Sequence, residues 1–261
     1  MIQAVATLIS GGHGFFLGAI GQKRLLDKFC PQVPHVIMIE RNAYSDECIK
    51  YLHKIGSQIK IVNAIRMKKK CSYAAKRWRQ TFTKLNLWTL AEFEHVLFMD
   101  ADAYPYSEDI FSKFKQFQPE FLAATTFRDN IGRFRSGMMV VKPDTKRYQD
   151  LCKFAWGDPA ENGAKLGDQG ILNCYVDSKD IKWTRVPYNW HTVVWSKNPK
   201  NVIIGHIRPK PWGNTCWEKN PKATRTLSNR KTWMHPYVNA WKQAILDTEE
   251  EHGPVPRGNL T

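Results

Sequence analysis

The sequence predicts an α/β fold: a mainly parallel sheet flanked by helices, in a single domain whose C-terminal part is irregular and rich in tryptophan. Three observations predict it. Short apolar stretches alternate with amphipathic ones as far as residue 175, which is typical of strands joined by crossover helices. The chain has 261 residues, 43% of them hydrophobic, which suits one large domain with a buried core. Beyond Trp183 the pattern changes to short strands with many Trp, Pro and Asn residues.

The expected elements follow one another in a regular order. Strands are expected where apolar residues form a short run bounded by turn residues, at residues 5–9, 35–39, 58–62, 95–99, 121–125 and 137–141. Helices are expected where apolar residues recur every three or four positions, at residues 15–29, 45–55, 81–93, 145–156, 168–175 and 238–247. We place the domain over residues 1–248. Residues 249–261 are charged and then rich in Pro and Gly, so we expect a flexible tail or linker there.

The chain is strongly basic, with 39 Lys and Arg against 24 Asp and Glu, a formal charge of +15. Such a charge favours anionic partners. The densest basic run covers residues 66–79 and includes Tyr73 and Trp78, a pattern that a single-strand nucleic-acid site would show. A solvated helix or loop face is the simpler interpretation, because charge runs usually have that role. One alternative function is therefore a non-catalytic nucleic-acid- or nucleotide-binding protein, whose affinity would fall steeply with salt.

Hydropathy and cysteine usage predict the cellular compartment of the protein. No apolar run approaches the ~18 residues that a membrane-spanning helix needs. The first residues lack the basic flank of a signal peptide. The six cysteines are scattered without a C-x-x-C pair, a pattern that fits neither a structural zinc site nor a disulfide scaffold. We therefore expect a cytoplasmic protein with reduced thiols and no membrane span.

The sharpest local signal is a pair of acids, Asp100 and Asp102, directly after an apolar strand. Ligands of open α/β sheets bind beyond the carboxyl ends of the strands. If the backbone stays extended, the two carboxylates project to the same side, where a divalent metal would relieve their repulsion. Two exposed acids in a polar loop are one alternative. A phosphohydrolase with Asp100 as nucleophile is another, although position 103 is Ala where a haloacid-dehalogenase-like motif has Thr or Val.

Further signals lie later in the chain. His206 is expected at the end of a strand, and the rigid Pro-Lys-Pro segment that follows would fix the direction of Lys210. On its own, His206 is typical of a hydrogen-bonded structural histidine, but beside two aspartates it becomes a candidate ligand for a manganese-type ion. Ser136 and Gly137 form a tight turn into a buried strand. Asp168 and Gln169 open a helix, a position where an acid alone would be interpreted as an N-cap.

Taken in order, these motifs resemble those of the glycogenin-like family 8 glycosyltransferases, from about Val5 to Trp212. Residues 83–88 are similar to the family's Thr-Lys-Leu-x-x-Trp helix, and residues 96–102 to its metal-binding strand. The other matching stretches are residues 134–141 (Asn-Ser-Gly turn), 167–173 (Gly-Asp-Gln-Gly-Ile-Leu-Asn) and 205–212 (His…Lys-Pro-Trp). Five motifs in the right order are far more specific than one.

The resemblance implies a Rossmann-like GT-A fold and a hexosyl- or pentosyltransferase. It also implies a UDP-sugar donor, a hydroxyl acceptor on a glycan or protein, Mn²⁺ or another divalent cation, retention of anomeric configuration, and no nucleic acid. By position, Asp100, Asp102 and His206 would hold the metal, and Asp168 and Gln169 would lie beside the anomeric carbon. The implied donor-binding residues are Ile9, Ser10 and Phe15 at the uridine, Lys84, Lys210 and Arg77 or Arg79 at the diphosphate, and Ser136 and Gly137 at the sugar. Ala101 is a further implied donor-binding residue.

The chain departs from the family pattern at three places. Arg135 stands where the family has the Asn of its Asn-Ser-Gly turn, which bears on the choice of donor sugar. Phe15 replaces a Tyr on the uridine side and lacks its hydroxyl. His206 and Lys210 are two residues closer together than in the family, so we expect a shorter loop over the diphosphate.

Overall fold

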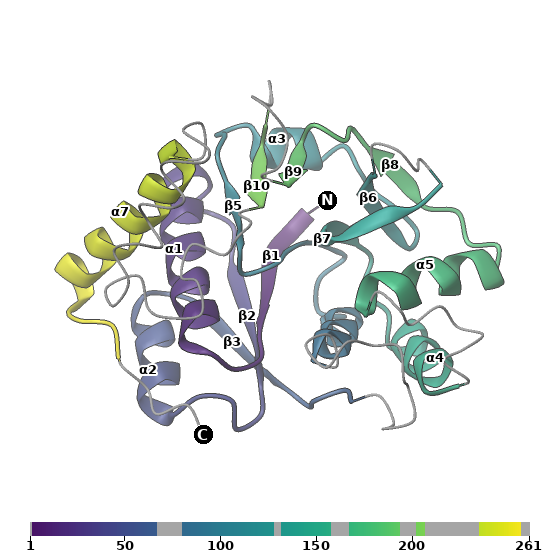
Figure 1. The fold of residues 1–261 in the computed structure, drawn as a ribbon, viewed down its shortest axis with the longest axis horizontal. Helices are drawn as coiled ribbons and strands as arrows, with labels where there is room; N and C mark the ends of the chain where they lie inside the picture. The colour runs from purple at the N-terminus through teal and green to yellow at the C-terminus, as the bar shows by residue number, and fades with distance from the viewer. Residues whose placement is uncertain are drawn as a thin grey trace.

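The central feature of the computed structural model is a seven-stranded sheet with the order β3-β2-β1-β4-β7-β6-β8 (Figure 1). The structure describes residues 2–66, 80–127, 132–157, 167–193, 202–206 and 235–256, and every structural statement below refers to these. The strands of this sheet are β1 (Ile2–Ile9), β2 (His35–Glu40), β3 (Gln58–Val62), β4 (His95–Met99), β6 (Leu122–Thr126), β7 (Phe134–Val141) and β8 (Thr184–Val186).

The sheet is mainly parallel, as predicted, with one strand reversed. β3, β2, β1 and β4 run parallel to one another, and β8 runs parallel to β6. β7 is antiparallel to both β4 and β6. The connection between β6 and β7 is too short for a crossover helix, so the chain must return antiparallel. As a result, the start of β7 lies beside the end of β4, and the Asp100 N–H donates to the Gly137 carbonyl at 2.9 Å.

Helices cover both faces of the sheet (Figure 1). On one side lie α1 (His13–Phe29), α2 (Asp46–Lys54) and α7 (His235–His252), and on the other the 3₁₀ helix η2 (Thr81–Thr89), α4 (Thr145–Trp156) and α5 (Asp168–Ser178). A short helix, α3 (Ile110–Phe114), lies between β4 and β6 in the chain. Side chains of β1 alternate between the two sides: Ala4 and Ala6 join the core under η2, α4 and α5, whereas Ile9 joins the core under α1, α2 and α7.

A second, three-stranded sheet was not predicted from the sequence as a separate unit. It has the order β5-β10-β9, with β5 (Ala103–Pro105), β9 (His191–Val193) and β10 (Ile204–His206). β10 pairs antiparallel with β5, and His206 lies opposite Ala103. This pairing brings a histidine from late in the chain to the end of β4.

The helix α7 extends beyond the domain boundary predicted after residue 248. Residues 249–252 continue the helix, the Tyr51 hydroxyl donates to the Gly253 carbonyl at 2.9 Å, and Val255 is buried. A Cβ on Gly21 would lie 2.5 Å from the Trp241 ring, so α7 packs against α1 at a position where only glycine leaves room. The predicted tail therefore begins inside a packed helix, while residues 257–261 lie outside the described part of the chain. No helix within the described ranges has both the length and the apolar character to span a membrane.

Candidate active site

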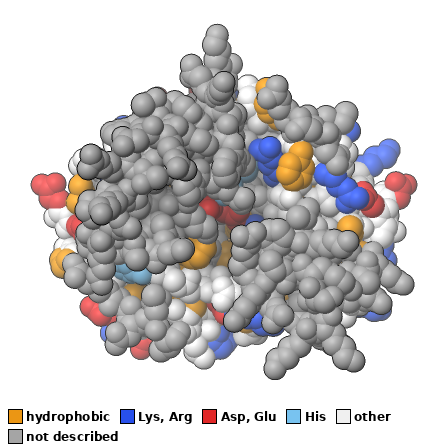
Figure 2. Space-filling view, in the orientation of Figure 1, with side chains coloured by type: hydrophobic (Ala, Val, Ile, Leu, Met, Phe, Trp, Pro, Cys, Tyr) orange, Lys and Arg blue, Asp and Glu red, His pale blue; other side chains and the backbone are white. Residues whose placement is uncertain are grey.

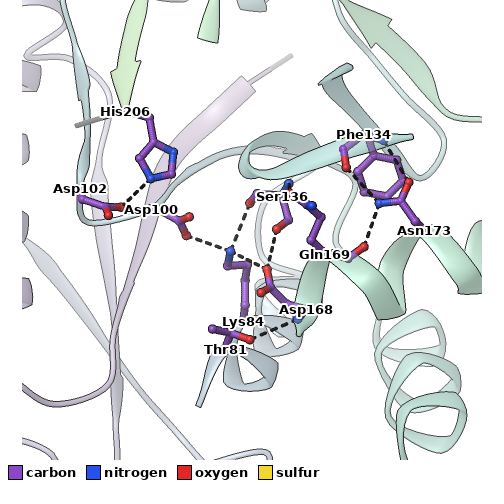
Figure 3. Close-up of polar contacts among 10 residues, drawn as sticks. All are labelled: Thr81, Lys84, Asp100, Asp102, Phe134, Ser136, Asp168, Gln169, Asn173 and His206. Atoms are coloured by element: carbon purple, nitrogen blue, oxygen red, sulfur yellow. Dashed lines mark hydrogen bonds and ion pairs between the residues drawn. The ribbon is translucent and has the colours of Figure 1, made fainter. Parts of the chain in front are cut away.

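The two aspartates lie on a turn at the carboxyl end of β4. The backbone does not stay extended after Met99, as the sequence analysis assumed. Instead, the Ala103 N–H donates to the Asp100 carbonyl at 2.8 Å, which closes a turn over residues 100–103. The carboxylates of Asp100 and Asp102 nevertheless converge (Figure 3). The prediction that the two acids meet is therefore consistent with the structure, but the turn, and not strand periodicity, brings them together.

His206 completes a cluster of three metal-ligating side chains. One ligand atom of each of Asp100, Asp102 and His206 lies within 4.8 Å of the others. His206 Nε2 is 3.0 Å from Asp102 Oδ1, and both residues are buried (Figure 3). Neither ring nitrogen of His206 makes a hydrogen bond of acceptable geometry to the described residues. Two carboxylate oxygens and an imidazole nitrogen without a hydrogen bond suit Mn²⁺, so the residues present fit such a cation.

Gly137 makes room for this cluster. A Cβ at this position would lie 2.9 Å from the His206 ring and 3.1 Å from Asp100 Oδ2. Real Cβ atoms do not approach other atoms so closely without displacing them. Ser136 and Gly137, predicted as a tight turn, lie inside β7, and Gly137 lies against the metal-ligating residues.

Lys84 joins this cluster to Asp168 at the start of α5. It comes from η2, is buried, and its ammonium lies 2.9 Å from Asp100 Oδ1 and 2.6 Å from Asp168 Oδ2. It also donates to the Ser136 carbonyl at 3.2 Å (Figure 3). Burial alone would lower the pKa of Lys84, but the two carboxylates outweigh it and raise that pKa above its ordinary value. These contacts use all three ammonium protons, so a direct contact with a diphosphate would have to replace one of them.

Asp168 and Gln169 are held at the N-terminus of α5, facing the start of β7. The Ser136 hydroxyl donates to Asp168 Oδ2 at 2.7 Å, and the Ser136 N–H donates to Gln169 Oε1 at 3.4 Å. The Asp168 N–H donates to the Thr81 hydroxyl at 3.2 Å. Gly167, and not Asp168, is the residue at the N-cap. The Asp168 side chain is therefore available to interact with Lys84 and Ser136.

Asn173 is a site residue that sequence reasoning missed. Its amide exchanges two hydrogen bonds with the backbone of Phe134, both at 3.0 Å, and also donates to the Gln169 carbonyl at 2.8 Å (Figure 3). These bonds fasten α5 to the start of β7. The available signal was its spacing, because Asn173 follows Gln169 by one helical turn and so lies on the same face.

The residues expected at the uridine lie at the same edge of the sheet. β1 and β4 are parallel neighbours, so Ile9 and Asp100 end at one edge, and Ile9 and Ala101 belong to one core cluster. Ser10 and Phe15 are half-buried on the loop and helix that follow β1. The Tyr44 hydroxyl donates to the Gly12 carbonyl at 3.0 Å and so fastens this loop. Arg77, Arg79 and Lys210 lie outside the described residues.

Charged side chains of both signs lie close together at this site. In the space-filling view, acidic and basic side chains lie next to each other near the centre (Figure 2). Within the cluster, the Asp100 side chain is 26% exposed whereas Asp102 is 6% exposed, so Asp100 is the ligand most open to a bound molecule. His206 and Asp102 are buried and Asp100 is partly exposed, so a cation held by all three could also contact an anionic group of a bound molecule.

Comparisons with known proteins decide the family. The model of glycosyl transferase family 8 matches residues 26–216, most of the chain. This chain belongs to glycosyltransferase family 8. Its GT-A fold is the fold of the galactosyltransferase LgtC, whose crystal structure with donor and acceptor sugar analogues covers 97% of this chain and 98% of that one, with a TM-score of 0.65 at 14% identity.

Curated relatives of this family 8 glycosyltransferase include two kinds of enzyme. A UDP-glucuronate:xylan alpha-glucuronosyltransferase 1 from Arabidopsis thaliana is 29% identical over 187 residues, which cover 71% of this chain and 26% of the relative. Glycogenin-1 from Mus musculus is 30% identical over 195 residues, which cover 67% of this chain and 56% of the relative. The chain thus spans about a quarter to a half of the length of these relatives.

The family model matches only part of the residues that form this site. The metal cluster, Lys84, Ser136, Gly137, Asp168 and Gln169 all lie within the matched residues 26–216. Ile9, Ser10 and Phe15 lie before that stretch, and α7 lies after it.

Proposed function

We propose that this protein transfers a sugar from a UDP-linked donor to a hydroxyl group of a glycan or protein, with a divalent cation, preferably Mn²⁺, and with retention of anomeric configuration. The observation that carries the proposal is the Asp100–Asp102–His206 cluster at the carboxyl edge of the sheet, joined through Lys84 to Asp168. Membership of family 8 supports the reaction class.

The metal-ligating residues would act on the leaving group. Asp100, Asp102 and His206 would hold the cation, which supplies Lewis-acid stabilisation of the departing diphosphate. The position of Asp102 and His206 inside the protein, with Asp100 partly exposed, supports a cation that is held from behind and open on one side. Lys84 adds a fixed positive charge within 2.9 Å of Asp100, at the place where negative charge grows.

The side chains at α5 would act on the sugar. Lys84 and the Ser136 hydroxyl both contact Asp168 Oδ2, and these contacts hold the carboxylate in one position. An ionised carboxylate beside the anomeric carbon stabilises the positive charge of an oxocarbenium-like transition state. Gln169 is oriented by the Ser136 N–H and would position the donor sugar next to that carboxylate.

The test is UDP release from a panel of UDP-sugars, with and without Mn²⁺. The panel includes UDP-glucuronate, because relatives include a glucuronosyltransferase, and neutral UDP-sugars. We expect slow hydrolysis of at least one donor that requires Mn²⁺, and a loss of at least 100-fold in the Asp102→Asn variant. Equal UDP release without metal, or an unchanged rate in Asp102→Asn, would contradict the metal assignment.

The alternatives from the sequence analysis find less support. Of the basic run at residues 66–79, the structure describes only Arg66, whose guanidinium binds both carboxylate oxygens of Glu40 and the Thr83 hydroxyl. This exposed cation is therefore already paired within the chain. The family match likewise favours glycosyl transfer over phosphate-ester hydrolysis at Asp100.

A cytoplasmic location remains a prediction from the sequence. The cysteines in the described ranges, Cys30, Cys48, Cys152 and Cys174, are free thiols. Burial raises the pKa of Cys30 to about 12, with a smaller contribution from Asp27, so this thiol is kept protonated and unreactive.

A further inference from the structure

A buried amide, Gln22, lies behind the aspartate turn. Gln22 is in the middle of α1 and has no exposed surface. Its Nε2 donates to the Ala103 carbonyl at 2.7 Å and to the Asp100 carbonyl at 3.2 Å. Both carbonyls belong to the turn that carries the metal-ligating aspartates. A buried amide is costly unless it is hydrogen-bonded, so its presence here calls for a role.

The orientation of the Gln22 amide is determined by its neighbours. Carbonyls only accept hydrogen bonds, so the amide NH₂ must face the turn and Oε1 must face away from it. Oε1 lies 3.0 Å from His35 Nε2, and His35 Nδ1 lies 3.5 Å from the Ser57 hydroxyl. His35 Nε2 therefore donates to Gln22, and Nδ1 accepts from Ser57. Burial, together with the nearby Lys23, lowers the pKa of His35 to about 3, which keeps the ring in the neutral form that this chain of donors needs.

A second side chain holds another carbonyl of the turn. The Tyr104 hydroxyl donates to the Ala101 carbonyl at 2.9 Å, and Tyr104 is fully buried. The carbonyls of residues 100, 101 and 103 thus all accept hydrogen bonds from buried side chains. We call Gln22 and Tyr104 the carbonyl brace. The hydrogen bonds from the brace to the turn all go to backbone oxygens, so they do not occupy the ligand atoms of Asp100 or Asp102.

We propose that the carbonyl brace, and Gln22 above all, positions the Asp100–Asp102 turn for the divalent cation, so that the metal site is formed before the metal arrives. This inference rests on the proposed metal-dependent function. If the turn were mobile, binding a cation would also have to order it, which would weaken affinity. Partners behind the direct ligands commonly change metal affinity by about 10–100-fold. Gln22 and Tyr104 are positioning residues, because neither contacts a reacting atom.

The experiment measures Mn²⁺ alone, without nucleotide, through the electron paramagnetic resonance signal of the free ion. Gln22→Met keeps the length of the side chain and removes its donors, and we expect its dissociation constant for Mn²⁺ to rise about tenfold or more. Tyr104→Phe removes one donor and should raise it less, by about threefold. In turnover assays, the Mn²⁺ concentration for half-maximal rate should rise in Gln22→Met, while the rate at saturating Mn²⁺ stays close to wild type.

A matched control separates positioning from general stability. Leu52→Ala opens a cavity beneath α2 and removes no hydrogen bond from the turn, because a leucine side chain has no donor. All proteins are measured well below their melting temperatures, and we expect Leu52→Ala to bind Mn²⁺ as wild type does despite a lower melting temperature. A merely structural role for the brace would make Gln22→Met behave like Leu52→Ala.

The outcomes are distinguishable. Wild-type affinity for Mn²⁺ in a folded Gln22→Met protein overturns this inference and leaves the proposed function standing. If Gln22→Met does not fold, Tyr104→Phe decides in its place, and unchanged affinity there overturns the inference. If the wild-type protein binds no Mn²⁺, the metal assignment of the proposed function fails, and the inference fails with it.

Discussion

The aspartate turn is held from two sides by buried polar networks of opposite character. On the α1 side, Ser57, His35 and Gln22 form a chain of hydrogen bonds between neutral side chains, here called the neutral chain. This chain ends with Gln22, which donates to the carbonyls of the turn. On the η2 side, the charged cluster of Lys84, Asp100 and Asp168 holds a carboxylate of the turn through an ion pair. The neutral chain fixes the backbone of the turn, whereas the charged cluster fixes the position of a side chain. We therefore expect the charged cluster to be disrupted by the loss of a charged side chain, and the neutral chain to be disrupted by acid.

The largest expected effect is on the charged cluster. Lys84→Met leaves Asp100 and Asp168 without their shared cation, and we expect the free energy of unfolding to fall by about 3–5 kcal/mol, as when one member of a buried ion pair is removed. Urea denaturation without added metal measures it. The control is Lys60→Met, which removes a surface pair with Glu92 and should not shift the midpoint measurably. Equal midpoints for Lys84→Met and wild type would show that the cluster contributes nothing to folding.

The neutral chain should instead respond to acid. The pKa of His35 is about 3 in the folded protein against about 6.5 when unfolded, so the unfolded chain takes up a proton first as the pH falls. Stability from this group is fully present above pH 6.5 and is lost as the pH falls from 6.5 towards 3. The slope is about 1.4 kcal/mol per pH unit, or about 3 kcal/mol between pH 6.5 and 4.5.

Denaturation at a series of pH values, compared between wild type and His35→Asn, isolates this contribution. The difference in unfolding free energy between the two proteins should shrink steadily below pH 6.5, because Asn does not titrate. A constant difference from pH 7 to pH 4.5 would mean that His35 does not take up its proton on unfolding.

The two networks also differ in how far the sequence predicted them. Lys84, Asp100 and Asp168 each stand in a motif with a recognisable spacing, so the sequence alone identifies all three as candidates. Gln22 and His35 carry no such spacing, because a single amide in an apolar helix and a histidine at the start of a strand also occur in ordinary cores. Only the tertiary fold, which packs α1 against the end of β4, shows what Gln22 does.

The same contrast applies to the fold. Runs bounded by turn residues predicted β3 and β4 with their observed bounds, because each combines a clear apolar stretch with clear ends. The three-residue strands β5, β9 and β10 are too short to show a period, so the second sheet could not be predicted. Residues 82–88 are all buried in η2, and a helix without an exposed side shows no periodic pattern that would tell α from 3₁₀.

A third prediction tests Gly137 of β7, which lies against the metal-ligating residues. Gly137→Ala places a methyl group 2.9 Å from His206 and 3.1 Å from Asp100, so either the β10 histidine or the aspartate turn must move. We expect a loss of about 1–3 kcal/mol in unfolding free energy, the usual cost of overpacking. Mn²⁺ affinity should fall as well, measured by the same resonance method. Thr248→Val, which removes a buried hydroxyl on α7, should lose stability but keep its Mn²⁺ affinity. Unchanged affinity in Gly137→Ala would mean that the ligands tolerate the displacement.

The smallest expected effect concerns Arg135, where the chain departs from its family. Side chains two apart on a strand share a face, so Arg135 lies on the face of β7 that Gly137 turns towards the metal ligands, while Ser136 faces Asp168. The guanidinium carbon lies 5.2 Å from the centre of the Phe127 ring, which limits its movement.

A half-buried cation at this place favours a negatively charged sugar, because a hydrogen bond to a charged group contributes about 1.5–3 kcal/mol. We expect Arg135→Asn to lower kcat/KM for UDP-glucuronate relative to a neutral UDP-sugar by about tenfold, which corresponds to about 1.4 kcal/mol. The control is Arg133→Asn, two residues earlier, where the arginine pairs with Asp177 at the surface and the ratio should not change. The same ratio of kcat/KM values in Arg135→Asn and wild type would remove Arg135 from donor selection and leave its contact with Phe127 as its role.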